Sequence, residues 1–435
     1  MHEPVWEPDP EVERWLEWAI AVVGPADWAR RRAAMKRFAA ELDAKLRGEV
    51  PADFTSPIRP DDRAGWYLYQ SELYLRQPRS FDMPLCARII PVAKRLGENI
   101  ETLKAIPFAA ERLRRGLVIA PNEIDSALFE LLVGQAYATR GWEDVAFVPE
   151  DAARPTPDLR VRRHGQALSV ECKRKRAISD YARREREKWW RISAPVRQAL
   201  IQRKLGVVLD YVFHVPLLTL SDDYLEQRVL PLIELAVPGR LIDDAELTVS
   251  MRPVDLATVQ RKLRHQMIRS DGTGLYRDLF GFKDLWKAIT FSVYGKPNQR
   301  TPRYLEGVLW ASASIWACDA PESMRARAQH FRRELADAVR QLPRGMPCTV
   351  HIGAEAYDGE GVETIRYERL AGEMVAEFDT DGRDLEVIYC HIFKVEIPFE
   401  ENWAVEEDAH YWLRNPKSLR YLLNPTLLLA VPPSE

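Results

Sequence analysis

Hydrophobic and polar residues follow a helical rhythm through the first quarter of the chain. In residues 1–115 apolar side chains recur at spacings of three and four, as in PEVERWLEWAIAVV, and prolines separate the runs. This pattern predicts a helical N-terminal region that is rich in Trp and Tyr. Such rings could stack on nucleic-acid bases, but large aromatic side chains carry the most apolar surface, and we expect them in the core.

The helical period continues in PNEIDSALFELLVGQAYATRG, where Pro and Asn mark the start of an amphipathic helix and Gly141 its end. A period of two then takes over. DVAFVP predicts a short strand, and TPDLRVRRHGQALSVECK predicts a hairpin that turns at His164-Gly165. A long basic helix, DYARREREKWWRISAPVRQALIQRK, and an apolar strand, GVVLDYVFHVP, follow. This succession predicts one mixed sheet with helical cover.

The later chain mixes both patterns, with helical spacing in PESMRARAQHFRRELADAVRQL and strands in CTVHIGAE and LEVIYCHIFKVEI. At 435 residues the chain exceeds a single core of ordinary size. We therefore expect a mixed α/β protein with three parts: a helical N-terminal domain (1–115), an α/β core (116–240) and an α+β C-terminal region (241–435).

Charge is distributed unevenly, although the formal net charge is only -3. Residues 171–204 contain 12 Lys or Arg and 4 Asp or Glu, whereas residues 354–408 contain 4 basic and 17 acidic residues. This asymmetry suggests a face for nucleic acid and an acidic lobe.

Cysteine usage and hydropathy indicate the compartment. The five cysteines form no C-x-x-C pair, no secretory leader precedes them, and no apolar run approaches the length of a membrane span. We expect a cytoplasmic protein without contact to a membrane.

The hairpin carries the strongest chemical signal. On its second strand Leu168, Val170 and Cys172 would face one way, and Ser169, Glu171 and Lys173 the other. Folding back would bring Asp158 beside Glu171, and two close carboxylates favour a shared cation. Mg²⁺, with Mn²⁺ as a substitute, suits these carboxylates and the backbone carbonyl of Cys172, while Lys173 could orient the attacking water.

Pro157-Asp158 and Glu171-Cys172-Lys173 resemble the motif of the PD-(D/E)xK nuclease superfamily. The resemblance implies a restriction-endonuclease-like core with a central mixed sheet flanked by helices, and a metal-dependent endonuclease. It also implies a further metal ligand on the preceding helix, where Glu130 takes that place and Glu123 is the second choice. A role in restriction or defence against foreign DNA follows by analogy only.

A run of basic residues follows the motif. We expect the following to contact phosphates: Arg174, Lys175, Arg176, Arg183, Arg184 and Lys188. DNA is the favoured partner over RNA, and cutting both strands would call for a homodimer or an accessory subunit. Two alternatives stay open: the basic helix is only a solvated surface, or the protein binds nucleic acid or assembles with partners without cutting.

Overall fold

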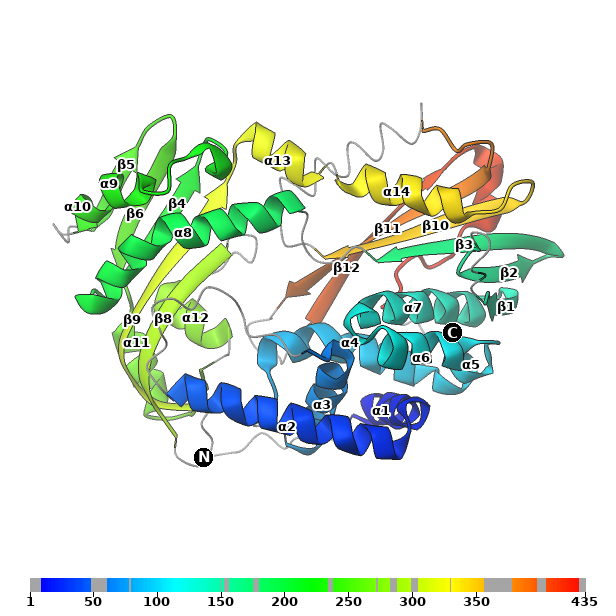
Figure 1. Cartoon of the computed structure of the whole chain (residues 1–435), viewed down its shortest axis with the longest axis horizontal. Helices are drawn as coiled ribbons and strands as arrows, with labels where there is room; N and C mark the ends of the chain where they lie inside the picture. The colour runs from blue at the N-terminus through cyan, green and yellow to red at the C-terminus, as the bar shows by residue number, and fades with distance from the viewer. Residues whose placement is uncertain are drawn as a thin grey trace.

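The strands predicted on either side of Gly165 belong to one of two mixed β-sheets. Figure 1 shows the computed structural model, in which helices cover both sheets. It describes residues 9–47, 61–77, 80–149, 151, 156–174, 180–233, 238–270, 273–281, 288–298, 304–328, 330–355, 378–396 and 404–429. The protein is therefore of the mixed α/β class, as predicted.

The described part of the N-terminal region is helical, as its spacing predicts. Aspartate side chains accept backbone N–H groups at three helix starts, where Asp9, Asp62 and Asp82 act as N-caps. The helices are α1 (Pro10–Val23), α2 (Pro25–Arg47), α3 (Arg63–Arg76), α4 (Met83–Glu98), α5 (Ile100–Ala105) and α6 (Ala109–Arg114).

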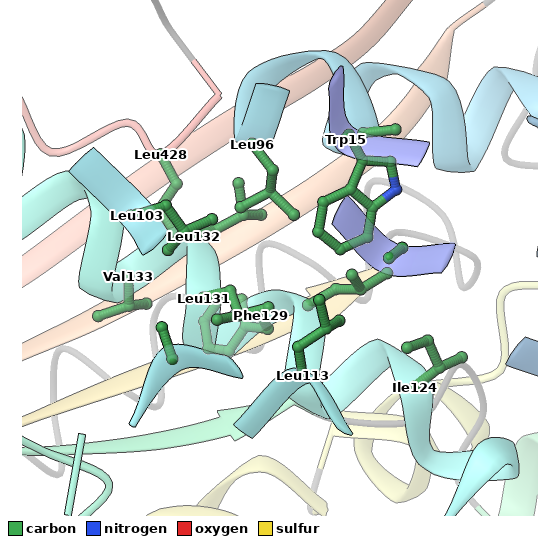
Figure 2. Close-up of a cluster of buried hydrophobic side chains, with 14 of the residues drawn as sticks. Trp15, Leu96, Leu103, Leu113, Ile124, Phe129, Leu131, Leu132, Val133 and Leu428 are labelled. Atoms are coloured by element: carbon green, nitrogen blue, oxygen red, sulfur yellow. The ribbon is translucent and has the colours of Figure 1, made fainter. Parts of the chain in front are cut away.

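The aromatic residues of these helices form the core. Figure 2 shows Trp15 among aliphatic side chains that include Leu96 and Leu113. The buried rings are Trp15, Trp18, Trp28, Trp66, Tyr67, Tyr69 and Tyr74. These rings are therefore not available to stack on bases.

The helix predicted before the hairpin is α7 (Ile124–Thr139). A short 3-10 turn at Pro121–Glu123 precedes it, and Gly141, with φ of 73°, follows it. Most of its residues are buried, because the helices α4, α5 and α6 contact one side and strands the other. The expected amphipathic pattern is therefore wrong, since this helix has almost no solvent face.

The hairpin lies in a sheet that we call the first sheet. In the described chain it has six strands in the order β1-β2-β3-β10-β11-β12, and β3 is parallel to β10. Helix α14 (His330–Gln341) packs against β3 and β10. The strands are β1 (Glu143–Phe147), β2 (Leu159–Arg163), β3 (Gln166–Arg174), β10 (Pro347–Glu355), β11 (Asp384–Glu396) and β12 (Ala404–Leu413).

The apolar strand GVVLDYVFHVP forms as β4 (Val207–Phe213), but it does not join the first sheet. That expectation is wrong. β4 lies in a second sheet, parallel to β9 and antiparallel to β6. Its alternate residues enter two separate cores, with Leu209 on one face and Val208 on the other, so it is an interior strand buried on both sides.

The second sheet has helices on both faces. Helices α8 (Asp180–Gln202), α9 (Tyr224–Arg228) and α10 (Leu230–Ile233) contribute to one core, and α11 (Leu256–Leu263) and α12 (Thr273–Phe280) to the other. Its other strands are β5 (Gly239–Asp243), β6 (Leu247–Pro253), β7 (Ile268–Arg269), β8 (Ala288–Pro297) and β9 (Tyr304–Cys318). Helix α13 (Pro321–Ala328) follows β9 and contacts α8 and α14.

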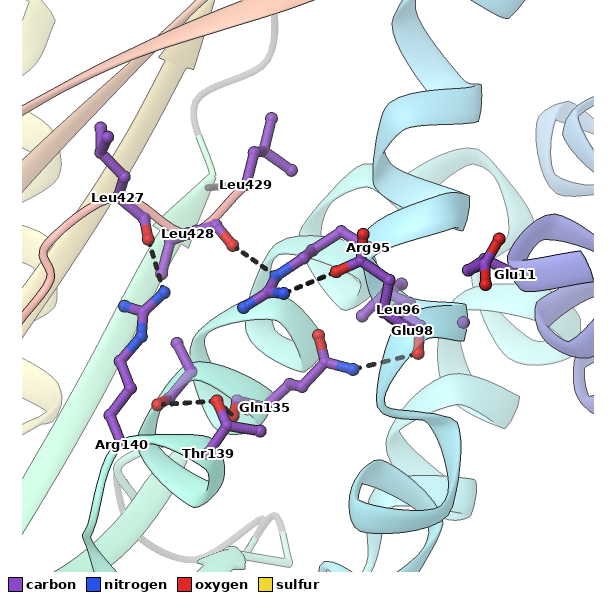
Figure 3. A network of polar contacts seen from close by, with 12 residues as sticks. Glu11, Arg95, Leu96, Glu98, Gln135, Thr139, Arg140, Leu427, Leu428 and Leu429 are labelled. Carbon is purple, nitrogen blue, oxygen red and sulfur yellow. Dashed lines mark hydrogen bonds and ion pairs between the residues drawn. The ribbon is translucent and has the colours of Figure 1, made fainter. Parts of the chain in front are cut away.

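The end of the described chain is fastened to the helical region. After β12 a 3-10 turn (Pro416–Tyr421) leads to a segment whose carbonyls accept hydrogen bonds from arginines. Arg95 donates to the carbonyl of Leu428 at 3.0 Å, and Arg140 donates to the carbonyl of Leu427 at 2.6 Å (Figure 3). The C-terminal segment therefore packs against α4 and the end of α7.

Two further expectations concern the acidic segment and contact with a membrane. Much of the acidic segment 354–408 lies outside the described residues, including 356–377. Among the helices that are described, none combines the length and the apolar character needed to cross a membrane.

Candidate metal centre

A two-residue turn folds β2 back onto β3. His164 and Gly165 both have positive φ, 49° and 77°, which is the backbone of a tight hairpin turn. The register then pairs Arg163 with Gln166 and Leu159 with Val170. Asp158, just before β2, therefore lies level with the Glu171 end of β3, as the sequence predicts.

Asp158 is bonded directly to the second half of the motif. Its Oδ2 accepts the backbone N–H of Cys172 at 2.8 Å. Cys172 lies beyond the last residue of β3 that pairs with β2, so this carboxylate continues the ladder where the β2 backbone has ended. The contact fixes Asp158 against β3.

Glu171 and Lys173 lie on the same face of β3 and touch. The ammonium of Lys173 donates to Oε1 of Glu171 at 2.6 Å. The Glu171 side chain is fully buried, whereas that of Lys173 keeps 20% of its surface exposed. Lys173 thus connects the buried carboxylate with the accessible side of the site.

The face that carries Glu171 is less open than the alternation of residues suggests. Glu171 pairs in register with Val350 of the parallel strand β10, so their side chains share a face. Val350 packs with Leu335 and Val339 of α14. Helix α14 therefore covers this face around Glu171, and Lys173, farther along the strand, is partly exposed.

The helix α7 contributes Glu130, as the resemblance implies. Glu130 is buried, and its Oε2 lies 3.0 Å from Nη1 of Arg112. The same nitrogen lies 3.3 Å from Oδ1 of Asp158. The guanidinium of Arg112, on α6, therefore bridges two carboxylates of the site, a role that no sequence pattern indicated.

Burial and mutual repulsion perturb the carboxyl groups. Burial, reinforced by the charge of Asp158, raises the pKa of Glu130 to about 8, although Arg112 opposes the shift. Burial and Asp158 likewise raise the pKa of Glu171 well above its usual value, against the pull of Lys173. Burial alone would lower the pKa of Lys173, but Glu171 raises it overall. Such carboxyl groups favour a bound proton or an added cation.

A cavity of about 640 Å³ opens beside these residues. Its polar lining includes Arg112, Arg115, Glu130, Asp158, Lys173 and Arg174. Glu123, the second choice for the metal-binding acid before the hairpin, also lines it and is exposed. The volume lies within the range of ligand sites in proteins. Asp158 and Lys173 of the motif line the cavity, whereas Glu171 is buried behind Lys173.

The residues fit a divalent cation in part. Oε2 of Glu171 is buried without a hydrogen-bond partner, whereas Oε2 of Glu130 forms an ion pair with Arg112. Carboxylate oxygens are the ligands that Mg²⁺ prefers. Within the described ranges, however, no three His, Cys, Asp or Glu side chains converge as a ready metal cage. Mg²⁺ binds through as few as one or two carboxylates and keeps several waters, so Asp158 and Glu171 suffice as a partial shell. That the backbone carbonyl of Cys172 is a metal ligand stays a prediction.

The basic residues divide into three groups. Arg183 and Arg184 are exposed on α8, and Arg183 pairs with Glu187 at 2.8 Å, which also suits the solvated-helix alternative. Lys188 is buried against Asp222, so its ammonium is not available to a phosphate in this arrangement. Lys175 and Arg176 lie outside the described residues.

Arg174 is held inside the protein. Its Nη2 donates to Glu355 at 2.7 Å, and its guanidinium lies 4.6 Å from the ring centre of Phe393. Arg88 shares Glu355 at 2.6 Å, so β10 brings a second buried ion pair beside the motif. The motif does not predict a role for Glu355, because Glu355 lies far from the motif in the sequence.

The site thus assembles α6, α7, β3 and the segment just before β2 around one cavity. Comparison of the chain with models of protein families and with curated proteins finds no match. The resemblance to the nuclease superfamily therefore rests on the motif and on the contacts just described.

Proposed function

We propose that the protein is a metal-dependent nuclease that hydrolyses phosphodiester bonds, with DNA favoured over RNA. The observation that carries the proposal is the bonding of Asp158 to the backbone of Cys172 beside the Glu171–Lys173 pair. A charged hairpin needs no such convergence of buried acids, because each acid would be more stable in water. In this proposal the first sheet and α7 form a restriction-endonuclease-like core.

The residues have separate roles. Asp158 and Glu171 would hold Mg²⁺, with Glu130 as the third carboxylate. The cation, when bound, supplies a Lewis acid and lowers the pKa of a water molecule. Lys173, between Glu171 and the cavity, would orient the attacking water and balance the charge of the phosphate.

Basic side chains that line the cavity or lie exposed on α8 would bind the nucleic-acid backbone. Arg115 lines the cavity, and Arg183 and Arg184 are exposed on α8. Contacts of this kind release counterions, so binding should weaken steeply as salt is added. That Lys175 and Arg176 also contact phosphates stays a prediction. A role in defence against foreign DNA rests on analogy with the superfamily.

A second function, nucleic-acid binding or assembly without cutting, has one observation in its favour. Arg112 and Lys173 already neutralise part of the acidic cluster, so the protein can fold without a metal. In that case the fold would serve as a platform.

Cleavage assays separate the two functions. Purified full-length protein is incubated with labelled double-stranded DNA, single-stranded DNA and RNA in Mg²⁺, Mn²⁺ or EDTA, together with Glu171→Ala. Metal-dependent cutting that Glu171→Ala abolishes supports the nuclease and identifies its substrate. Salt-sensitive binding without cutting by the unaltered protein contradicts the nuclease and supports the platform.

A further inference from the structure

Arg112 is fixed in the acidic cluster by the backbone as well as by charge. Its Nη2 donates to the carbonyl of Val148 at 3.1 Å, and the guanidinium lies 5.8 Å from the ring centre of Phe147. The side chain is only 6% exposed. These contacts hold the cation in place independently of the carboxylates, so it is a built-in part of the site.

The position of Arg112 determines which oxygens remain for a metal. Nη1 lies within ion-pair distance of both Glu130 and Asp158. On the other side of the cluster, Lys173 takes Oε1 of Glu171, and Oε2 of Glu171 has no hydrogen-bond partner. Arg112 therefore pairs with Glu130 and with one oxygen of Asp158, whereas the second oxygen of Glu171 lacks a counter-charge.

The formal charges of the cluster suit one divalent ion better than two. Three carboxylates, Arg112 and Lys173 together leave one negative charge when all are ionised. One divalent ion changes this to one positive charge, which a single phosphodiester neutralises. A second divalent ion would leave a buried cluster with a large positive charge, and burying unpaired charge is costly.

We propose that Arg112 is a resident cation of this centre, so that the centre takes one divalent ion, on Asp158 and Glu171, and not a pair. This inference rests on the proposed function. Two-metal sites place two ions about 4 Å apart on shared carboxylates. Here the carboxylates of Glu130 and Asp158 share a guanidinium instead. Arg112 is thus a positioning residue that sets the number of metal ions.

The test counts bound ions without measuring cleavage. Metal-free full-length protein is titrated with Mn²⁺ in the absence of nucleic acid, and free Mn²⁺ is followed by electron paramagnetic resonance. One ion per chain is the expected result. Two ions in the unaltered protein would overturn the inference and leave the nuclease proposal standing, whereas no bound ion would contradict both.

Variants test whether Arg112 sets this number. Arg112→Met removes the cation and should admit a second Mn²⁺, while Arg112→Lys should keep one. Arg114→Met is the matched control, because Arg114 lies exposed on the same helix, and it should also keep one. One ion in a folded Arg112→Met protein, as judged by circular dichroism, would overturn the role of Arg112.

A variant at the partner of Arg112 covers the case in which Arg112→Met does not fold. Glu130→Gln keeps the shape of the side chain and removes its charge. One Mn²⁺ should still bind, more weakly, because Asp158 and Glu171 remain. Loss of all Mn²⁺ binding in this variant would show that the ion depends on Glu130, and would overturn the division of the acids proposed here.

Discussion

The carboxylate of Asp158 and the backbone N–H of Cys172 form a 2.8 Å hydrogen bond that joins the two halves of the hairpin motif. The bond replaces a rung of the β2–β3 ladder at the place where the β2 backbone has ended. It explains why an acid can stand at this position, because the N–H stabilises the carboxylate while Asp158 stays beside Glu171.

The bond predicts different outcomes for two substitutions of Asp158. Asp158→Asn keeps an oxygen that accepts the Cys172 N–H but loses the charge, so stability should stay close to that of the unaltered protein while cleavage falls to the level seen in EDTA. Asp158→Ala also loses the acceptor, so its free energy of unfolding should be about 1–2 kcal/mol lower. Urea unfolding and cleavage assays measure both effects. Full activity of a folded Asp158→Asn protein would contradict the assignment.

Glu130 predicts that the metal-free protein is less stable at alkaline pH. Its pKa is raised from 4.5 to about 8 by burial and by Asp158, so the folded state holds a proton that the unfolded state releases. Stability from this group is full below pH 4.5 and is lost as the pH rises to about 8. Thermal melts in EDTA should show this fall, and Glu130→Gln should flatten it. A Glu130→Gln profile that matches the unaltered protein would contradict this explanation.

Two glycines allow α7 to approach the first sheet and so place Glu130. A Cβ on Gly353 would lie 2.7 Å from the Phe129 ring, and one on Gly134 would lie 2.8 Å from Phe147. Gly353→Ala and Gly134→Ala should each destabilise the protein by about 1–3 kcal/mol and reduce cleavage. Gly307→Ala, which meets no atom within 4 Å, is the control and should be neutral. Unchanged urea midpoints in all three variants would show that α7 tolerates the displacement.

A buried chain of hydrogen bonds runs through the first sheet, away from the cavity. It links Tyr137 to His351 at 3.0 Å, His351 to His391 at 3.0 Å, and His391 to Glu407 at 2.8 Å. Glu407 also accepts the N–H groups of Leu428 and Leu429, so the chain ends on the C-terminal segment. If Glu407 is ionised, each donor points toward it and every group is satisfied with both histidines neutral.

This chain predicts acid sensitivity. Burial, together with His391 and Arg140, lowers the pKa of His351 well below 6.5, so the unfolded state binds the proton first. Stability from this group is present above pH 6.5 and is lost as the pH falls below it. His351→Phe should be less stable at pH 7.5 but should lose less stability on going to pH 5, as measured by urea unfolding. His265→Asn, at an exposed histidine, is the control and should leave the pH dependence unchanged.

The sequence predicts local elements of this protein better than their assembly. The hairpin, its turn at His164-Gly165 and the helix that carries Glu130 follow from periodicity and turn chemistry, which act over a few residues. The pairing of β3 with β10 joins segments about 180 residues apart and leaves no local pattern. For the same reason the sequence pattern does not predict that β4 lies in the second sheet. Arg112 was missed because an arginine on a helix has no distinguishing spacing.

The motif residues themselves could be chosen from sequence because the chemistry constrains their types and their strand positions. The residues that surround them could not be predicted from the sequence. Glu355, which holds Arg174, and Asp222, which holds Lys188, come from distant segments, and each forms an ion pair with a basic side chain that was expected to contact phosphates. A run of basic residues in the sequence therefore does not reveal which of their side chains form ion pairs within the protein.

The most direct test of the nuclease proposal compares two matched ion pairs. Glu171→Gln and Lys173→Ala alter the buried pair of the motif, whereas Glu101→Gln and Lys104→Ala alter an exposed pair, 2.8 Å apart, on α5. Cleavage of labelled DNA in Mg²⁺ is measured for all four folded variants. The account predicts that both motif variants lose cleavage while keeping salt-sensitive binding, and that both α5 variants cut normally. Cleavage by folded Glu171→Gln at the rate of the unaltered protein would contradict it.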